Sequence, residues 1–459
     1  MPQYLSPGVY VEEVPPSARP IAGVGTSTAG FIGMIVPDTL TIPIEAVRNE
    51  KVATGDAATT AFKLQKYPVD TTAETFKVYI NGTAATVTLT NDEQKKESTV
   101  TFSTAPVKDA KITADYTVIS TLTVAAEKQE KLCTNFSKFK EFFGDFSTDS
   151  GQNKLAHAVY GFFNNGGTTC YVIRIKDISG LEAALARFAT IDEIAIVAIP
   201  GITTKAEQEA VLVHCENLKD RVAILDGQRN PIAFTKELIQ AATKDSTYGA
   251  IYFPWIKVDD PVQKILKPGS DGTVIVPPSG YIAGVYARVD SERGVYKAPA
   301  NEGIRGALDV EYRLTQADQS LLNPGGVNVL RAFGGNIKIW GARTMGGDTN
   351  AEFKYISTRR LFNFLRESID DGTQFAVFEP NSQSLWQQIV RNVSDFLLGQ
   401  WRDGALFGDT PKQAFFVKCD AETNPSDVRE RGQVVTEIGV AIVKPAEFVI
   451  FRIQQITGS

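Results

Sequence analysis

The chain has few side chains that could carry out chemistry, and their spacing does not favour it. Its two histidines are His157 and His214. His214 precedes Cys215 on a predicted helix, where adjacent side chains point about 100° apart and form neither a metal chelate nor a nucleophile–base pair. We therefore expect both histidines to pack within helices, and we expect no catalytic residue and no metal site.

The segment 276–303 is the best candidate for an active-site loop. An enzyme would use its serine as the nucleophile and nearby backbone groups as an oxyanion site. The segment contains no histidine to act as the base, although a lysine could. We favour an ordered connection whose charges bind backbone groups and neighbouring subunits. The residues concerned are Ser279, Arg288, Asp290, Arg293, Lys297 and Asn301.

Motifs for cofactors are missing from the sequence. There is no GxxxxGK[ST] phosphate loop and no GxSxG elbow. Gly23-Val24-Gly25 lacks the third glycine and the preceding strand of a dinucleotide site. We therefore expect no cofactor.

The composition excludes several classes of protein. The 459 residues suggest about two to four domains. A net charge of −6 argues against a general nucleic-acid binder, and no run reaches the roughly 18 apolar residues of a membrane span. With no signal peptide and no CxxC motif, we expect assembly in the cytoplasm and free buried thiols. The cysteines are Cys133, Cys170, Cys215 and Cys419.

Both ends of the chain are predicted to be extended arms. Residues 1–20 contain five prolines, which disfavour helix, around the run GVYVEEV. The last fifteen residues, PAEFVIFRIQQITGS, contain a strand-forming run that is apolar on both faces. Such a strand needs cover on both faces and partners for its backbone. The residues that we expect to pair are Val9, Tyr10, Val11, Phe448, Val449, Ile450, Phe451 and Ile453.

Between the arms the pattern changes twice. The sequence from 46 to 125 has the pattern of β-strands throughout, with Asn81-Gly82 as a hairpin turn, and it predicts an inserted β domain. The strands YVIRI, IAIVAIP and RVAILD then alternate with helices, which implies βαβ units and a largely parallel sheet. The predicted core of the insert is Phe76, Val78, Ile80, Val100, Phe102, Ile112 and Tyr116.

The C-terminal part has strands and two amphipathic helices. GNIKIWGART and QFAVFEP are predicted strands, and FKYISTRRLFNFLRESI and SQSLWQQIVRNVSDFLLGQW are predicted helices. Asn381 is a plausible N-cap of the second helix. The expected fold class is α/β, α+β overall. The expected divisions are an arm at 1–20, an outer or middle α/β domain at 21–45 plus 126–320, an inserted β domain at 46–125, a C-terminal α/β domain at 321–445 and an arm at 446–459.

A chain of segments in this order resembles the contractile tail sheath family. The segments include PPSGYIAGVYARVDSERGVYKAPAN, LLNPGGVNVLRAF, KIWGARTM, FAVFEPNSQSLW, GALFGDTPKQAFFVKCD and PAEFVIFRIQQ, together with the N-terminal YLSPGVYVEEV. The family includes the sheaths of contractile phage tails, R-type bacteriocins and phage-tail-like extracellular injection systems. The resemblance covers the arm at 1–36 and residues from about 130 onward, and it does not cover the insert.

The resemblance implies a structural protein without enzymatic activity. Family members stack as hexameric rings into a helical tube around an inner tail tube, and contraction of a metastable extended state drives that tube through a target envelope. Their terminal arms add strands to a small sheet of neighbouring subunits. Implied partners are further copies of the chain, the tube protein, baseplate and terminator proteins and related sheath proteins, with no nucleic acid and no membrane insertion. The particle would be extracellular after release.

The resemblance also implies a charged face of the C-terminal domain against the inner tube. Exposed ion pairs suit a contact that must break, since each contributes only about 0–1 kcal/mol. Two alternatives remain open, an enzyme that uses segment 276–303 and a baseplate or tube component. The candidate tube contacts are Lys354, Arg359, Arg360, Arg366, Arg391 and Arg402.

Overall fold

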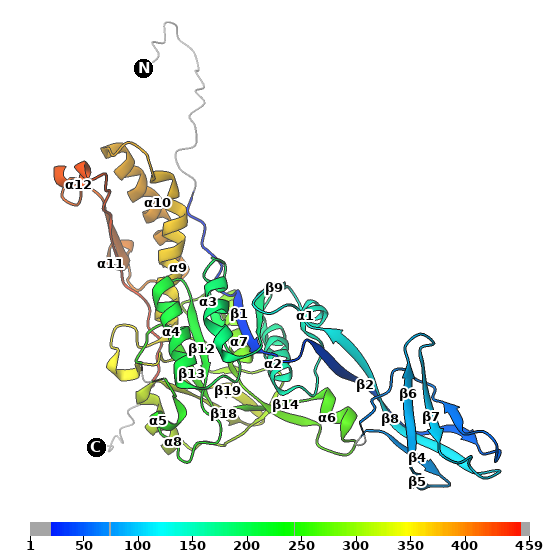
Figure 1. The fold of residues 1–459 in the computed structure, drawn as a ribbon. Coiled ribbons are helices and arrows are strands. Elements are labelled where there is room, and N and C mark those ends of the chain that lie inside the picture. The colour runs from blue at the N-terminus through cyan, green and yellow to red at the C-terminus, as the bar shows by residue number, and fades with distance from the viewer. Residues whose placement is uncertain (1–19, 73–74, 243, 451–459) are drawn as a thin grey trace, which may run out of the picture. The chain divides into compact units, whose positions relative to one another are not determined.

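The computed structural model describes residues 20–450, apart from residues 73, 74 and 243 (Figure 1). The chain divides into two compact units. The larger unit is Gly25–Arg360, and the smaller one combines Met1–Val24 with Leu361–Ser459. The predicted division between residues 320 and 321 does not coincide with this boundary.

A nine-stranded sheet forms the centre of the larger unit. Its inner strands pair in parallel, from β18 through β13, β12, β11 and β1 to β10, and antiparallel strands lie at both edges. The strands in spatial order are β16 (Glu302–Gly303), β19 (Asn336–Ile339), β18 (Val327–Phe333), β13 (Gly249–Phe253), β12 (Val222–Asp226), β11 (Ile196–Ala198), β1 (Ala29–Met34), β10 (Cys170–Ile175) and β9 (Glu130–Cys133). The predicted α/β class and its parallel strands are confirmed.

Helices cover both faces of this sheet, which explains why its central strands are apolar on both sides. On β1, Phe31 faces the core that includes α1, α2 and α7, and Ile32 faces the core that includes α3 and α4. The helices are α1 (Phe136–Phe143), α2 (Ser150–Asn165), α3 (Leu181–Phe188), α4 (Lys205–Leu218) and α7 (Ser279–Arg293).

The segment 276–303 is mostly a buried helix, which corrects the interpretation as a loop. Its glycines let α7 approach α2 closely: a Cβ on Gly280 would lie 2.3 Å from the Ala158 carbonyl oxygen. Glycine lowers helix propensity, so the composition suggested a connection, but the tight helix pair requires it. Arg288 does bind backbone groups as expected, since it donates to the carbonyls of Asn165 at 3.1 Å and Gly303 at 2.6 Å.

The insert is a β domain with its own core. Asn81 and Gly82 have φ values of 48° and 84° and join β4 to β5, as predicted for a type I′ turn. Five of the seven predicted core residues are buried, and Phe76 and Ile80 are partly buried. The strands are β2 (Thr39–Thr54), β3 (Ala61–Lys63), β4 (Lys77–Ile80), β5 (Thr83–Ala85), β6 (Val87–Asp92), β7 (Glu97–Phe102) and β8 (Lys111–Thr123).

The larger unit has further short elements around the sheet. The strands β15, β14 and β17, in this order, form a separate three-stranded sheet that is not hydrogen-bonded to the nine-stranded sheet. These elements are β14 (Ile256–Asp259), β15 (Thr273–Val276), β17 (Ala307–Val310), α5 (Lys236–Ile239), α6 (Pro261–Leu266), α8 (Gln316–Leu322), η1 (Ile178–Gly180), η2 (Asn323–Gly325) and η3 (Gly347–Thr349).

The smaller unit contains two long helices and one pair of strands. Its elements are α9 (Ile356–Thr373), whose residues up to Arg360 belong to the larger unit, η4 (Gln374–Ala376), α10 (Gln383–Arg402), α11 (Pro411–Ala414), β20 (Phe415–Lys418), α12 (Ser426–Glu430) and β21 (Glu437–Val440).

Two local expectations for the smaller unit are wrong. The predicted strand QFAVFEP is the turn η4 followed by irregular chain, because Phe378 adopts a φ of 67° and no neighbouring strand pairs with the segment in the described residues. The N-cap of α10 is Ser382 instead of Asn381. Asn381 accepts a hydrogen bond from Trp386 Nε1 at 2.8 Å and donates to the Gln433 carbonyl, so its side chain is engaged elsewhere.

Among the described residues, no helix has the length and apolar character needed to cross a membrane, and no group of acidic residues, histidines and cysteines is arranged to hold a metal ion.

Candidate assembly surfaces

The β20–β21 pair of the smaller unit has two open edges. The strands pair antiparallel from Phe415 with Val440 to Lys418 with Glu437, and in the described residues no third strand joins them. Phe416 and Ile438 leave 58% and 36% of their side chains exposed. Because an isolated pair of strands is only marginally stable, this sheet is suited to accept further strands.

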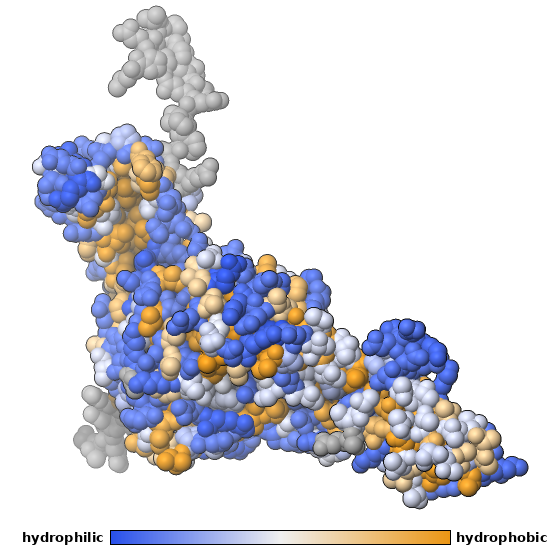
Figure 2. Space-filling view, viewed as in Figure 1, coloured by the Kyte–Doolittle hydropathy of each residue, from blue (hydrophilic) through white to orange (hydrophobic). Residues whose placement is uncertain are grey.

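Helix α10 supports one side of this pair. It packs on β20, and its buried residues are Leu385, Trp386, Ile389, Asn392, Val393, Phe396 and Leu397. The helical spacing of apolar residues in the sequence predicts a stripe of which five members are buried and two, Val390 and Trp401, are partly buried. The predicted stripe is Trp386, Ile389, Val390, Val393, Phe396, Leu397 and Trp401. Figure 2 shows hydrophobic residues gathered beside the strand pair on the visible face of this unit.

The chain directly after β21 pairs with residues 405–407 through an antiparallel bridge between Leu406 and Ile442, and this pairing ends before the apolar run. The backbone N–H of Val443 still donates to the Ala405 carbonyl, and residues 444–450 have no regular secondary structure. Phe448, Val449 and Ile450 are 69%, 70% and 80% exposed. The predicted strand is thus not formed within the single subunit for these residues. Val9, Tyr10, Val11, Phe451 and Ile453 lie outside the described residues.

Arg360, a predicted tube contact, is buried within the larger unit. Its guanidinium donates to both carboxylate oxygens of Asp290 at 2.9 and 2.5 Å, and the two side chains are 3% and 6% exposed. Burial opposes its positive charge, but Asp290 outweighs that effect and raises the pKa of Arg360. Thr26 completes the group, because its hydroxyl donates to Asp290 at 2.6 Å.

Arg359 is also buried, between two aromatic rings. Its guanidinium lies 4.3 Å from the ring centroid of Tyr248 and 3.5 Å from that of Phe353. Burial lowers its pKa. Lys354 is half-buried and pairs with Asp348 at 2.6 Å. All three side chains, Lys354, Arg359 and Arg360, therefore make their contacts inside the subunit.

The three other predicted tube contacts are exposed. They are Arg366 on α9 and Arg391 and Arg402 on α10. Phe416 was not singled out from the sequence. Two adjacent phenylalanines in a strand point to opposite faces, and this pattern is the signal that one of them needs a second surface.

The groups that suggested an enzyme are engaged in structural contacts. Ser279 is buried and donates its hydroxyl to Asp226 at 2.8 Å. Burial raises the pKa of Asp226 to about 6, while hydrogen bonds from Gly201 and Ser279 act in the other direction. All four cysteines are free and buried.

His157 is a buried residue of α2, in agreement with the prediction that it packs within a helix. Its burial makes the stability of the protein depend on pH. Burial lowers its pKa from 6.5 to about 4, and neither ring nitrogen has a hydrogen-bond partner in the described structure. The unfolded chain therefore binds a proton first as the pH falls, and stability is lost below pH 6.5. The shifted pKa of His157 should therefore lower the free energy of unfolding by about 2 kcal/mol at pH 5 relative to pH 8.

We expect His157→Leu to remove this loss. Urea denaturation of the variant and the parent protein at pH 8 and pH 5 measures it. Between pH 8 and pH 5, the free energy of unfolding of the variant should fall by less than that of the parent. An equal difference between the two proteins at both pH values would contradict the assignment.

An open strand pair and an exposed apolar run are features that suit a subunit of a larger assembly. Residues 178–345 match the phage tail sheath protein central domain, and residues 348–456 match the phage tail sheath C-terminal domain. The two matches together span more than half of the chain. The chain therefore belongs to the phage tail sheath family, which consists of structural proteins of phage tails and contractile injection systems.

Relatives and solved structures agree with this membership. The chain is 26% identical over 252 residues to the tail sheath protein of Burkholderia phage BcepMu. The aligned region covers 52% of this chain and 51% of the relative. It is 30% identical over 180 residues to the tail sheath protein of Vibrio phage KVP40, and this aligned region covers 38% of this chain and 25% of the relative. The aligned parts thus span about half of the first relative and a quarter of the second.

The fold extends over nearly the whole chain. The contracted sheath complex of the extracellular contractile injection system PVC matches with a TM-score of 0.67 at 24% identity, covering 99% of both chains. The contracted helical sheath of the anti-feeding prophage matches with a TM-score of 0.65 at 23% identity, covering 98% of this chain and 99% of the other.

Proposed function

We propose that this chain polymerises into a helical sheath around an inner tube and contracts to drive the tube through a target envelope. The open edges of the β20–β21 pair are the observation that carries the proposal. Together with the exposed run Phe448–Ile450 of the same unit, they favour strand exchange between subunits. Backbone hydrogen bonds would set the register, and alternate apolar side chains would fill pockets.

The N-terminal arm takes part in the same exchange in this proposal. Val9, Tyr10 and Val11 would add a strand to a neighbour, as Phe448–Ile453 would from the other end. Strands shared in this way can stay paired while the domains around them rotate. The partners are further copies in stacked rings, a tube protein, and baseplate and terminator proteins. The particle would assemble in the bacterial cytoplasm and act outside it.

Electron microscopy of the purified protein in negative stain tests polymerisation. We expect tubes or stacked rings. A monodisperse monomer under all conditions of salt, pH and concentration would contradict the proposal.

The exposed arginines of the smaller unit are the proposed tube contacts. Reversal to Glu at Arg366, Arg391 and Arg402 should weaken co-assembly with the tube protein by roughly tenfold or more, since each exposed pair contributes up to about 1 kcal/mol and reversal adds repulsion. Co-sedimentation with the tube protein measures it.

Arg313→Glu is the matched control for this experiment. Arg313 is an exposed arginine of the larger unit, with 74% of its side chain accessible. Its reversal should leave co-assembly unchanged. If the triple variant co-sediments as well as this control, the three arginines do not contact the tube.

A further inference from the structure

The inserted β domain joins the central sheet through two chain segments that lie close together. The outgoing segment, 35–38, leads from β1 into β2, and the returning segment, 124–129, leads from β8 into β9. The backbone N–H of Val124 donates to the Asp38 carbonyl at 2.9 Å. Next to it, β2 and β8 begin their pairing at Thr39 and Thr123. The insert therefore leaves and re-enters the sheet at one point.

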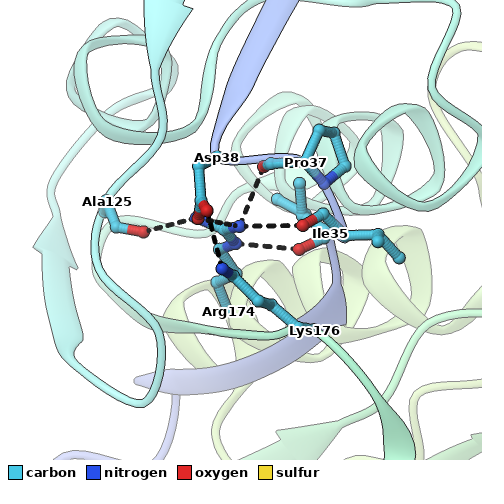
Figure 3. A network of polar contacts seen from close by, with 7 residues as sticks. Ile35, Pro37, Asp38, Ala125, Arg174 and Lys176 are labelled. Carbon is cyan, nitrogen blue, oxygen red and sulfur yellow. Dashed lines mark hydrogen bonds and ion pairs between the residues drawn. The ribbon is translucent and has the colours of Figure 1, made fainter.

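Arg174 of β10 lies at this point and is almost completely buried, with 1% of its side chain exposed. Figure 3 shows its guanidinium surrounded by oxygen atoms of both segments. On the outgoing side it donates to the carbonyls of Ile35 at 2.8 Å, Val36 at 3.1 Å and Pro37 at 2.8 Å and to Asp38 Oδ1 at 2.8 Å. On the returning side its Nη1 donates to the Ala125 carbonyl at 3.1 Å.

Neighbouring contacts hold the same two segments. Lys176, also near the end of β10, pairs with the second carboxylate oxygen of Asp38 at 2.7 Å. Lys176 and Arg174 together lower the pKa of Asp38. The N–H of Ala125 donates to the Phe142 carbonyl at 2.8 Å, and the N–H of Lys128 donates to the Arg174 carbonyl at 2.9 Å. Both segments are thus fastened to the central part of the larger unit.

A buried guanidinium needs acceptors, because leaving its donors without partners in the interior is costly. Here most of the acceptors are main-chain carbonyls of the two segments. If the segments swung freely as linkers, the buried charge would lose those acceptors. The planar fork of arginine matches several carbonyls at once, which lysine cannot do.

We propose that Arg174 clamps both stems of the insert, so that the β domain is carried as a fixed projection of the central sheet. This inference goes beyond the proposed function and does not depend on polymerisation. From the clamp outward, β2 and β8 stay paired as far as Thr54 and Lys111, which extends the fixed geometry into the insert. In a sheath, such a domain would project at a regular spacing.

Pulsed electron–electron spin resonance on the full chain tests the clamp. Nitroxide labels at Lys108→Cys in the insert and Glu182→Cys on α3 occupy exposed positions, and the four native cysteines are buried. The parent background should give one narrow distribution of label distances. Arg174→Lys keeps the charge but loses the fork, so the distribution should become roughly twofold broader or more.

Arg187→Lys is the matched control. Arg187 of α3 is 51% exposed and makes a two-point contact with Glu130, the first residue of β9, which follows the returning segment 124–129 but is not part of it. It should leave the distribution narrow. A broad distribution in the parent, or an equally narrow one in Arg174→Lys and Arg187→Lys, overturns the proposal.

Asp38→Ala covers the case in which Arg174→Lys does not fold. Asp38 is 68% exposed, so its removal does not open the interior, yet it takes away one contact of Arg174 and the ion-pair partner of the Lys176 ammonium. The distribution should broaden, though less than for Arg174→Lys. An unchanged width in Asp38→Ala would overturn the clamp as well.

Discussion

A chain that ends at Pro445 should fold and yet fail to form sheaths. The deletion removes Phe448, Val449 and Ile450, which are largely exposed in the single subunit, and leaves the backbone hydrogen bond from Val443 to Ala405 intact. Little buried surface is lost, so the melting temperature should stay within a few degrees of the parent value. Without a strand to add to the neighbour, assembly should be abolished.

A shorter deletion is the matched control for this experiment. Removal of residues 455–459 alone spares the apolar run and takes away the polar end of the chain. Negative-stain microscopy should show sheaths for this variant and none for the chain ending at Pro445. Normal sheaths from the longer deletion would refute strand exchange by this arm, while the melting temperature shows whether a failed assembly is instead a failure to fold.

Asp290→Asn should destabilise the larger unit by about 3–5 kcal/mol, because it leaves a buried guanidinium without its counter-charge. Arg360 is 3% exposed and forms a two-point contact with this carboxylate. The amide would also present a donor to groups that themselves donate, among them the Thr26 hydroxyl. Urea denaturation measures the loss.

Asp309→Asn provides the comparison within the same unit. Asp309 pairs with Arg313 at 2.9 Å, but the two side chains are 33% and 74% exposed. Water solvates such a pair, so the same substitution should cost less than about 1 kcal/mol. If both variants shift the denaturation midpoint equally, the Asp290–Arg360 pair has no special structural role.

Local patterns in the sequence predicted much of the fold. The strands β10, β11 and β12 were predicted from short apolar runs, and the insert from alternating residues around Asn81-Gly82. These features depend on the period of burial and on turn chemistry, both of which neighbouring residues express directly.

Contacts between distant residues explain the predictions that failed. QFAVFEP has the composition of a strand, but a strand needs a partner and the described structure offers none there. Helix α7 was missed because Gly280 and Gly284 lower helix propensity, and only the close approach of α2 explains them. In both cases the deciding neighbour lies far away in the sequence.

The candidate site shows the same division. The resemblance implied a charged face against the inner tube, and arginine is usually exposed, so Arg359 and Arg360 were predicted to be surface contacts. Arg359 is buried against Tyr248 and Phe353, and Arg360 is buried against Asp290. No local sequence pattern predicts these partners. Arg366, Arg391 and Arg402 remain as predicted contacts because they are exposed.

The sequence alone established the α/β class, the inserted β domain, the apolar run at Phe448–Phe451 and the resemblance to tail sheaths, since all of these are expressed along the chain. Only the tertiary structure decided which charges are buried, that β20 and β21 have open edges, and that Arg174 binds both stems of the insert. The physical reason is that hydrogen bonds and ion pairs depend on partners brought together by folding, whereas burial periodicity is written in successive residues.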